Sequence, residues 1–175
     1  MNYQIDPKHS AAHFSVRHMT IAKVKGEFGN VTGTVDFDPV NPEAGSVNVS
    51  IEAASIYTRD PQRDGHLKTP DILSAEQHPA ITFKSKKIEK AGAGYKVTGD
   101  LTLRGVTQEV VLNVSQISAE VTDPWSLQRR GATATAVISR KAFGMGWNME
   151  VPGVGPMVSD EVDVDLDIEM TRAAS

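Results

Sequence analysis

Histidine side chains are the first candidates for chemistry in this chain, because a neutral imidazole nitrogen is a common metal ligand. Three of the five histidines, His9, His13 and His18, lie near the N-terminus. His13 and His18 are an odd number of residues apart, so on one strand they face opposite sides. His66 and His78 lie elsewhere, the chain has no cysteine, and no histidine pair has metal-site spacing within an expected helix. The sequence therefore predicts no metal site.

Signatures of catalysis are absent from the sequence. There is no Gly-x-Ser-x-Gly turn, no phosphate-binding loop and no dinucleotide-binding fingerprint. Serine, histidine and aspartate occur, but without a pattern that would join them into a site. We therefore expect no catalytic residues, no cofactor and no enzymatic activity.

Length and composition are those of one globular domain spanning residues 1–175. Hydrophobic residues make up 39% and charged residues 23% of the chain, which is ordinary for a soluble protein. The net charge of −4 argues against nucleic acid as a partner, because phosphate binding calls for a basic face.

The N-terminus has no basic patch followed by an apolar run, and no stretch of the chain is long enough to span a bilayer. We therefore expect a cytoplasmic protein without stable membrane insertion, or a periplasmic or secreted one if a leader has been removed.

Alternation of apolar and polar residues is the strongest structural signal. From Val162 to Met170 every second residue is apolar and every residue between is acidic. A β-strand turns this pattern into one apolar and one polar face, whereas a helix would scatter the charges. The alternation recurs along the chain and predicts an all-β fold of about eight strands. The other alternating segments are 12–19, 31–37, 47–51, 81–84, 95–103, 110–114 and 132–140.

Turn-like segments separate these strands, at 38–42 and 91–94 for example. One stretch, about 61–76, is expected to form a short helical insertion. Pro61 suits a first helical position, and Asp60 before it suits an N-cap.

About eight antiparallel strands fit either a sandwich or an up-and-down barrel. Small residues at inward positions would either leave a bore open or allow bending and close packing, and the pattern alone favours neither. These residues are Gly33, Gly99, Ala132, Ala134 and Ala136.

Five motifs, in order and at matching spacing, resemble the YceI-like family over about residues 5–169. They are 9–19, 26–28 with 35–39, Arg63-Asp64-Gly65-His66-Leu67-Lys68, 99–107, and 138–144 with Trp147.

The resemblance implies a single extended lipocalin-like antiparallel barrel whose hydrophobic bore holds a long isoprenoid lipid. The ligand would be a polyisoprenoid, an isoprenoid quinone or an isoprenyl phosphate, held for storage, sequestration or transport. A homodimer is possible in such a family. The alternative is a small-molecule hydrolase or isomerase using the same cavity. Where the family often has an aromatic pair after aspartate, this chain has Asp71-Ile72-Leu73, a less bulky gate.

The bore would be lined by apolar side chains, and Phe143, Met145 and Trp147 would share one face of a strand. The expected lining residues are Phe14, Val16, Phe37, Val49, Ile51, Phe83, Val97, Leu101, Leu103, Leu112, Ile138, Phe143, Met145, Trp147 and Leu166.

Four polar residues are candidates for contact with a lipid head group: His18, Arg63, Asp64 and His66. His18 shares a face with Phe14 and Val16, so it points inward either as a hydrogen-bonded core residue or as a contact for a quinone carbonyl or phosphate. For Arg63 and Asp64 we favour a structural ion pair that holds the helix over the barrel end.

Overall fold

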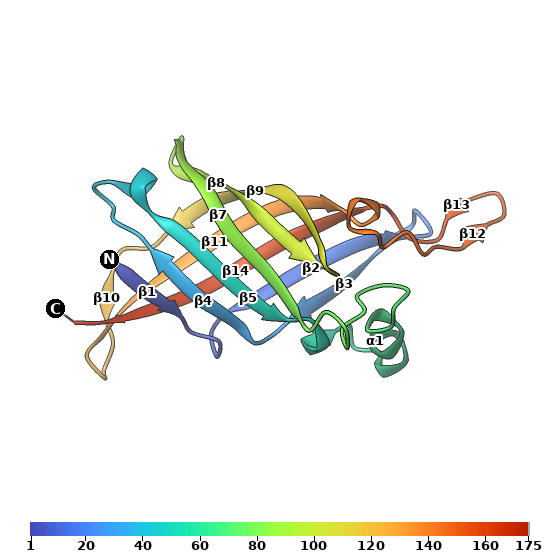
Figure 1. Ribbon diagram of the computed structural model, residues 1–175, viewed down its shortest axis with the longest axis horizontal. Helices are drawn as coiled ribbons and strands as arrows, with labels where there is room; N and C mark the ends of the chain where they lie inside the picture. Colours follow the sequence, from blue (N-terminus) through green and yellow to red (C-terminus); the bar gives the residue numbers. More distant parts are fainter. Residues whose placement is uncertain (175) are drawn as a thin grey trace.

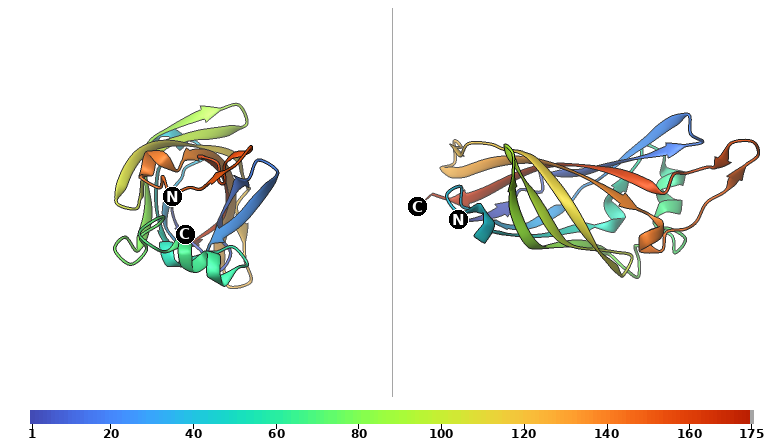
Figure 2. Two further views of the ribbon diagram at one scale, coloured as in Figure 1. Left: turned by 90° about the vertical axis from the view of Figure 1, so that its right-hand side faces the viewer. Right: turned by 90° about the horizontal axis from the view of Figure 1, so that it is seen from above.

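The computed structural model describes residues 1–174, which form an elongated antiparallel β-barrel (Figure 1). Helix α1 (Pro61–Leu67) and the hairpin of β12 (Glu150–Val151) and β13 (Gly155–Pro156) lie at one end. Both chain termini lie at the other (Figure 2). We call these the helix end and the terminal end. Within residues 1–174, no helix is long and apolar enough to cross a bilayer.

Eight strands close into a ring, because β14 pairs with β11 as well as with β1. The all-β barrel is thereby confirmed, and the sandwich is ruled out. In order around the ring the strands are β11 (Leu127–Ser139), β9 (Val106–Ile117), β8 (Gly94–Leu103), β7 (Ala80–Ala91), β5 (Ser46–Glu52), β4 (Val31–Asp36), β1 (Asn2–Ile5) and β14 (Glu161–Ala173).

A second run of strands continues the barrel toward the helix end. There β2 (Ala11–His18) replaces β1 as the partner of β14, β3 (Ala22–Phe28) pairs with β2, and β6 (Ile56–Tyr57) pairs with the last two residues of β3. The β2–β3 hairpin therefore reaches beyond the closed ring (Figure 2). The remaining elements are β10 (Val121–Thr122) and the 3₁₀ turns η1 (Pro42–Ala44), η2 (Ala53–Ser55) and η3 (Lys141–Phe143).

The register between β11 and β14 sets small residues beside large ones on the inner face. Ala134 pairs with Leu166 and Ala136 with Val164, while acidic residues of β14 face outward. A row of alanines removes side-chain volume from the interior of a small barrel, which side chains otherwise fill. Small inward residues leave the bore open at some positions and allow close packing at others. The alanines line open space, whereas a Cβ on Gly99 would lie 2.5 Å from the Phe83 ring.

Helix α1 begins as the sequence predicts. Asp60 accepts hydrogen bonds from the main-chain nitrogens of Gln62 and Arg63, and Pro61 occupies the first turn. The helix ends at Leu67, and the rest of the predicted insertion forms turns.

The predicted ion pair between Arg63 and Asp64 is wrong, because both side chains bind Thr58 instead. The buried Asp64 carboxylate accepts from the Thr58 main-chain nitrogen at 2.9 Å and from its hydroxyl at 2.5 Å. Arg63 donates from Nε to the Thr58 hydroxyl and from Nη2 to its carbonyl oxygen. Thr58 thus joins the helix to the strand β6 that precedes it.

The expected common strand face for Phe143, Met145 and Trp147 is also wrong. Residues 141–143 form η3, and Gly144 follows with a φ of 77°, a left-handed conformation that favours glycine. The chain then leaves the sheet, so the alternation of side chains that holds along β11 does not continue here.

Replacing Asp64 with alanine should lower the free energy of unfolding by about 1–3 kcal/mol, because the buried Thr58 nitrogen loses its partner. Urea denaturation followed by circular dichroism measures the change. Gln62→Ala, on the exposed side of the same helix, is the control and should change little. Equal stabilities of the two variants would contradict the anchoring role of Asp64.

Candidate functional site

The barrel encloses an elongated apolar cavity of about 700 Å³. Its wall comes from the inner faces of the strands, where alternation brings valine, leucine, isoleucine and phenylalanine inward. All but one of the predicted lining residues lie on this wall, and their contact with a ligand stays a prediction. Those on the wall are Phe14, Val16, Phe37, Val49, Ile51, Phe83, Val97, Leu101, Leu103, Leu112, Ile138, Met145, Trp147 and Leu166.

Phe143 is the exception. It is 1% exposed and packs in the core cluster that also contains Ala53 and Leu73, behind the wall. The loop after η3 instead brings Met145 and Trp147 to the cavity.

At the terminal end the cavity is covered by large side chains. Phe37 and Met170 line it there, and Tyr3, which has no exposed surface, packs in the same cluster. The Arg130 guanidinium lies 5.7 Å from the centre of the Phe37 ring, and its Nε donates to the Tyr3 hydroxyl at 2.9 Å. We call this group of residues the floor.

The cations at and below the floor, Arg130 and Arg172, share one carboxylate, that of Glu120. Glu120 accepts a hydrogen bond from the Tyr3 hydroxyl and pairs with Arg172, whose Nη2 lies 2.8 Å from Glu120 Oε1. The hydrogen bond from Arg172, followed by that from Tyr3, lowers the pKa of Glu120. The Arg172 guanidinium also lies over the Tyr3 ring. An ionised carboxylate thus fixes the aromatic side chains of the floor.

At the helix end the cavity opens between α1 and the C-terminal loops. Its lining there includes Gln62 and Arg63, whose side chains are exposed, and His66. The ring of His66 meets that of Trp147 edge-on at 4.6 Å, which joins α1 to the loop after η3. We call this opening the mouth.

Arg140 is a buried cation at the mouth. Its guanidinium donates to the carbonyl oxygens of Ser159 and Met145 at 2.9 Å, with longer contacts to Trp147 and Val158. Burial lowers its pKa, and Asp160 opposes that shift. A guanidinium held by carbonyl dipoles keeps its positive field available to a negative group in the mouth.

The predicted head-group residues fall in different places. His18, Arg63 and His66 lie at the mouth, whereas Asp64 is buried beneath the helix and does not face the cavity. The His18 ring faces the cavity and makes no hydrogen bond or ion pair with any side chain of residues 1–174.

Several residues of the site were absent from the predicted lining set, including two from the segment expected to form a gate. Ile72 and Leu73 are buried and line the cavity beside α1. The Asp71-Ile72-Leu73 segment, where this chain differs from the family pattern, is therefore part of the wall. Arg130 belongs to the floor, and Arg172 lies below it. Extending the alternation of β11 and β14 by two residues would have placed both arginines inward.

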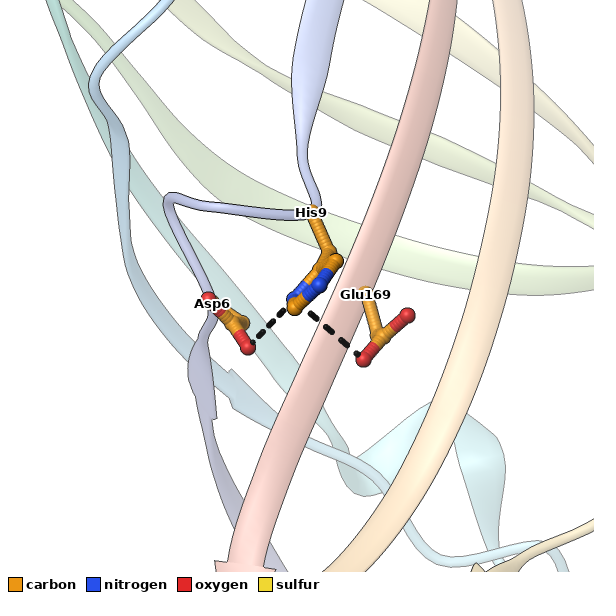
Figure 3. A group of neighbouring side chains, drawn as sticks. All are labelled: Asp6, His9 and Glu169. Atoms are coloured by element: carbon orange, nitrogen blue, oxygen red, sulfur yellow. Dashed lines mark hydrogen bonds and ion pairs between the residues drawn. The ribbon is translucent and has the colours of Figure 1, made fainter.

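One group of side chains outside the bore has donors suited to a metal. Asp6, His9 and Glu169 place ligand atoms within 4.8 Å of one another (Figure 3). However, Arg129 Nη1 lies 2.9 Å from Asp6 and 2.5 Å from Glu169, so a guanidinium already occupies these carboxylates. Asp123 completes the network at 2.6 Å from Arg129 Nε. We interpret the group as an ion network that joins the β1–β2 turn to β14 and β11.

Comparison with known proteins identifies the barrel. Residues 3–170 match the model of the YceI-like domain. The chain belongs to the YceI-like family. It is 36% identical over 170 residues to Protein YceI of Escherichia coli, covering 96% of this chain and 85% of that protein.

Solved structures share the YceI-like barrel. BcnA of Burkholderia cenocepacia has a TM-score of 0.82 at 25% identity, with 94% of this chain and 98% of that chain covered. A polyisoprenoid binding domain from Saccharophagus degradans, implicated in plant cell wall breakdown, has a TM-score of 0.66. At 17% identity over 96% of this chain and 97% of that one, this second likeness shows the fold alone.

Because of the ion network, the stability of the folded protein should decrease at acidic pH. The hydrogen bond with His9 is the main cause that lowers the pKa of Asp6 from 3.8 to about 2. A carboxyl group whose pKa is lowered on folding stabilises the folded protein at pH values above its ordinary pKa. This contribution is lost as the pH falls toward about 2.

Asp6→Asn should therefore lower the melting temperature above about pH 4 and flatten its fall between about pH 4 and 2. Thermal unfolding at several pH values measures this. Glu76→Gln, at an exposed position outside the network, should keep the native profile. A native profile in Asp6→Asn would show that Asp6 does not set the acid limit.

Proposed function

We propose that this YceI-like protein binds a long isoprenoid lipid in its bore and holds it for storage, sequestration or transport. The observation that carries the proposal is the cavity itself, apolar along its length, covered by a floor and open at a polar mouth. The Saccharophagus degradans domain named for polyisoprenoid binding has the same fold, which supports this ligand class.

The tail would supply most of the affinity. Each methylene that leaves water for an apolar site contributes about 0.8 kcal/mol. A cavity of about 700 Å³ lies within the range of sites that enclose most of a small ligand's surface. Loss of tail flexibility offsets part of this gain.

The head group would lie at the mouth, beside the side chains that can donate a hydrogen bond. His18 has no partner there among the side chains of residues 1–174. Arg140 and Arg63 bring positive charge, and Asp60 lies 3.9 Å from Arg63 at the same opening. These groups suit an acceptor, either a quinone carbonyl or a phosphate.

We propose binding rather than catalysis as the role of this cavity. Its wall is almost entirely hydrocarbon, and the His18 ring forms no hydrogen bond with a serine, aspartate or glutamate that would make an acid–base pair. A hydrolase or isomerase would need such a pair near the reacting atoms.

Organic extraction and mass spectrometry of the purified protein should find an isoprenoid lipid near one per chain. Val97→Asp should lose it, because a carboxylate on the bore wall, where Val97 is 5% exposed, has neither water nor a partner. Val137→Asp is the matched control, since Val137 is 58% exposed on the outer face and should keep the lipid. A folded Val97→Asp protein with a full lipid load would overturn the bore as the binding site.

Titration with isoprenoids of one head group and several tail lengths should separate the two parts of the ligand. Affinity should rise steeply with length until the tail reaches the floor. His18→Ala should change head-group preference and weaken long-chain binding by no more than about tenfold, since one neutral hydrogen bond is worth about 1 kcal/mol. Affinity that ignores length, or collapses without His18, would show that the head group dominates.

A further inference from the structure

We propose that the helix end docks on an anionic lipid surface through the tips of two hairpins beside the mouth. This inference rests on the proposed function, because its purpose is to let a lipid pass between membrane and bore. The first tip is the β2–β3 turn, residues 17–25, and the second is the β12–β13 hairpin, residues 149–157. We call them the docking tips.

The docking tips are neighbours in space. The Met19 nitrogen donates to the Met157 carbonyl oxygen at 2.7 Å, and His18 forms an isolated antiparallel bridge with Val158. Both tips lie at the helix end, and the β12–β13 hairpin extends furthest from the barrel (Figures 1 and 2). His18, Met157 and Val158 also line the cavity, so the tips continue directly into the mouth.

Exposed apolar side chains lie on the docking tips, at both turns and, for Met149, at the base of the second hairpin. Ile21 is 77% exposed, and Met149 and Val154 are exposed on the second hairpin, along with Pro152 and Pro156. Large aliphatic side chains at the ends of projecting turns stay in water at a cost. Lipid at the boundary between head groups and acyl chains would cover them.

Basic residues lie within the first tip, on the two strands that lead to and from its turn. Residues 17–25 contain Arg17, Lys23 and Lys25 and no carboxylate. Arg17 pairs with Lys23 across the hairpin, and Lys25 follows on the same outer face. Lys23 forms an ion pair with Asp163 at 3.1 Å, whereas Arg17 and Lys25 form none within residues 1–174. Like charges placed opposite each other destabilise a strand pair, and an anionic surface would remove that cost.

Charge distinguishes this end from the terminal end, which also exposes apolar residues. Val40 is 90% and Trp125 is 76% exposed there. However, the charges near Val40 are mixed, because Lys87 of β7 lies near Glu43, and Trp125 follows Asp123. The second tip carries one carboxylate, Glu150, but the first tip has three cations and no carboxylate, which makes it the better match for an anionic surface.

The test is co-sedimentation with vesicles of phosphatidylcholine, with and without phosphatidylglycerol. The native protein should bind the anionic vesicles more tightly than the neutral ones. Arg17→Ser with Lys25→Ser should weaken anionic binding by roughly thirtyfold, since each cation near such a surface is worth about one kcal/mol. Ile21→Ser with Met149→Ser and Val154→Ser should weaken it by at least about tenfold. Matched controls are Lys90→Ser with Lys96→Ser, and Val40→Ser with Trp125→Ser, which should bind as the native protein does.

Orientation has an independent readout, because the chain has two tryptophans, one near each end. With brominated acyl chains in the vesicles, Trp147 should be quenched in a Trp125→Phe protein, and Trp125 should not be quenched in a Trp147→Phe protein. Quenching of Trp125 alone would place the membrane at the wrong end and overturn the proposal.

Uptake of isoprenoid added in ethanol, without vesicles, tests the proposed function separately from docking. Docking-tip variants that take up the lipid normally from solution but do not bind vesicles would support docking. Native protein that loads from solution yet binds neither vesicle would overturn docking and leave the bore intact. In that case, concentration-dependent self-association would identify a second copy as the partner of the tips.

Discussion

Hydrogen bonding between β11 and β14 along their whole lengths closes the sheet into a barrel. Every other feature of the molecule depends on this seam. Without it the inner faces of the strands would meet water, and the cost would grow with each valine and leucine exposed. Because β14 also pairs with β1 and then β2 on its other edge, a single strand connects the terminal end to the helix end. The alanine row of β11 lies along this seam, so the contact that closes the barrel also leaves space inside it.

The two ends of the barrel hold their charged groups in different ways. At the terminal end, charged groups pair with one another, and their hydrogen bonds fix Tyr3 beneath the cavity. At the helix end, neutral oxygens accept the hydrogen bonds of Arg63 (Thr58) and Arg140 (main-chain carbonyls), and Asp60 lies 3.9 Å from Arg63. Paired charges contribute little field outside their own contact, whereas a cation among dipoles keeps its charge. The two ends therefore differ in how their cations are held: two arginines share the Glu120 carboxylate at the floor, whereas neutral oxygens accept the hydrogen bonds of Arg63 and Arg140 at the mouth.

The parts of the structure that follow from local pattern were predictable. Alternation revealed most of the longer strands but missed β3, and the cap at Asp60 fixed the start of α1. Alternation also placed the predicted strand residues on the cavity wall, and their contact with a ligand stays a prediction. It failed where the backbone leaves the sheet, as at Gly144, and Phe143 was consequently assigned to the wrong surface.

Contacts between distant residues were beyond sequence reasoning. Tyr3 meets Glu120 and Arg130 only because the barrel closes, and no local signal joins these positions. The β1 strand is four residues long, too short for its alternation to be distinctive. The pairing of Arg63 and Asp64 with Thr58 rather than with each other was likewise decided by the turn that brings β6 against α1.

An isoprenoid held in this bore, as proposed, would be shared between the protein and a bilayer. Acyl chains are as apolar as leucine, so an isoprenoid tail gains little by moving from membrane to protein. The large hydrophobic term favours both over water and cancels in the exchange between them. What remains is the fit of the tail against the floor, the contacts of the head group at the mouth, and the cost of any passage through water. That passage would expose the whole tail at about 0.8 kcal/mol for each methylene. A barrel whose mouth touches the membrane avoids this barrier, while one that floats free must cross it. Small polar differences at the mouth can then decide loading and release.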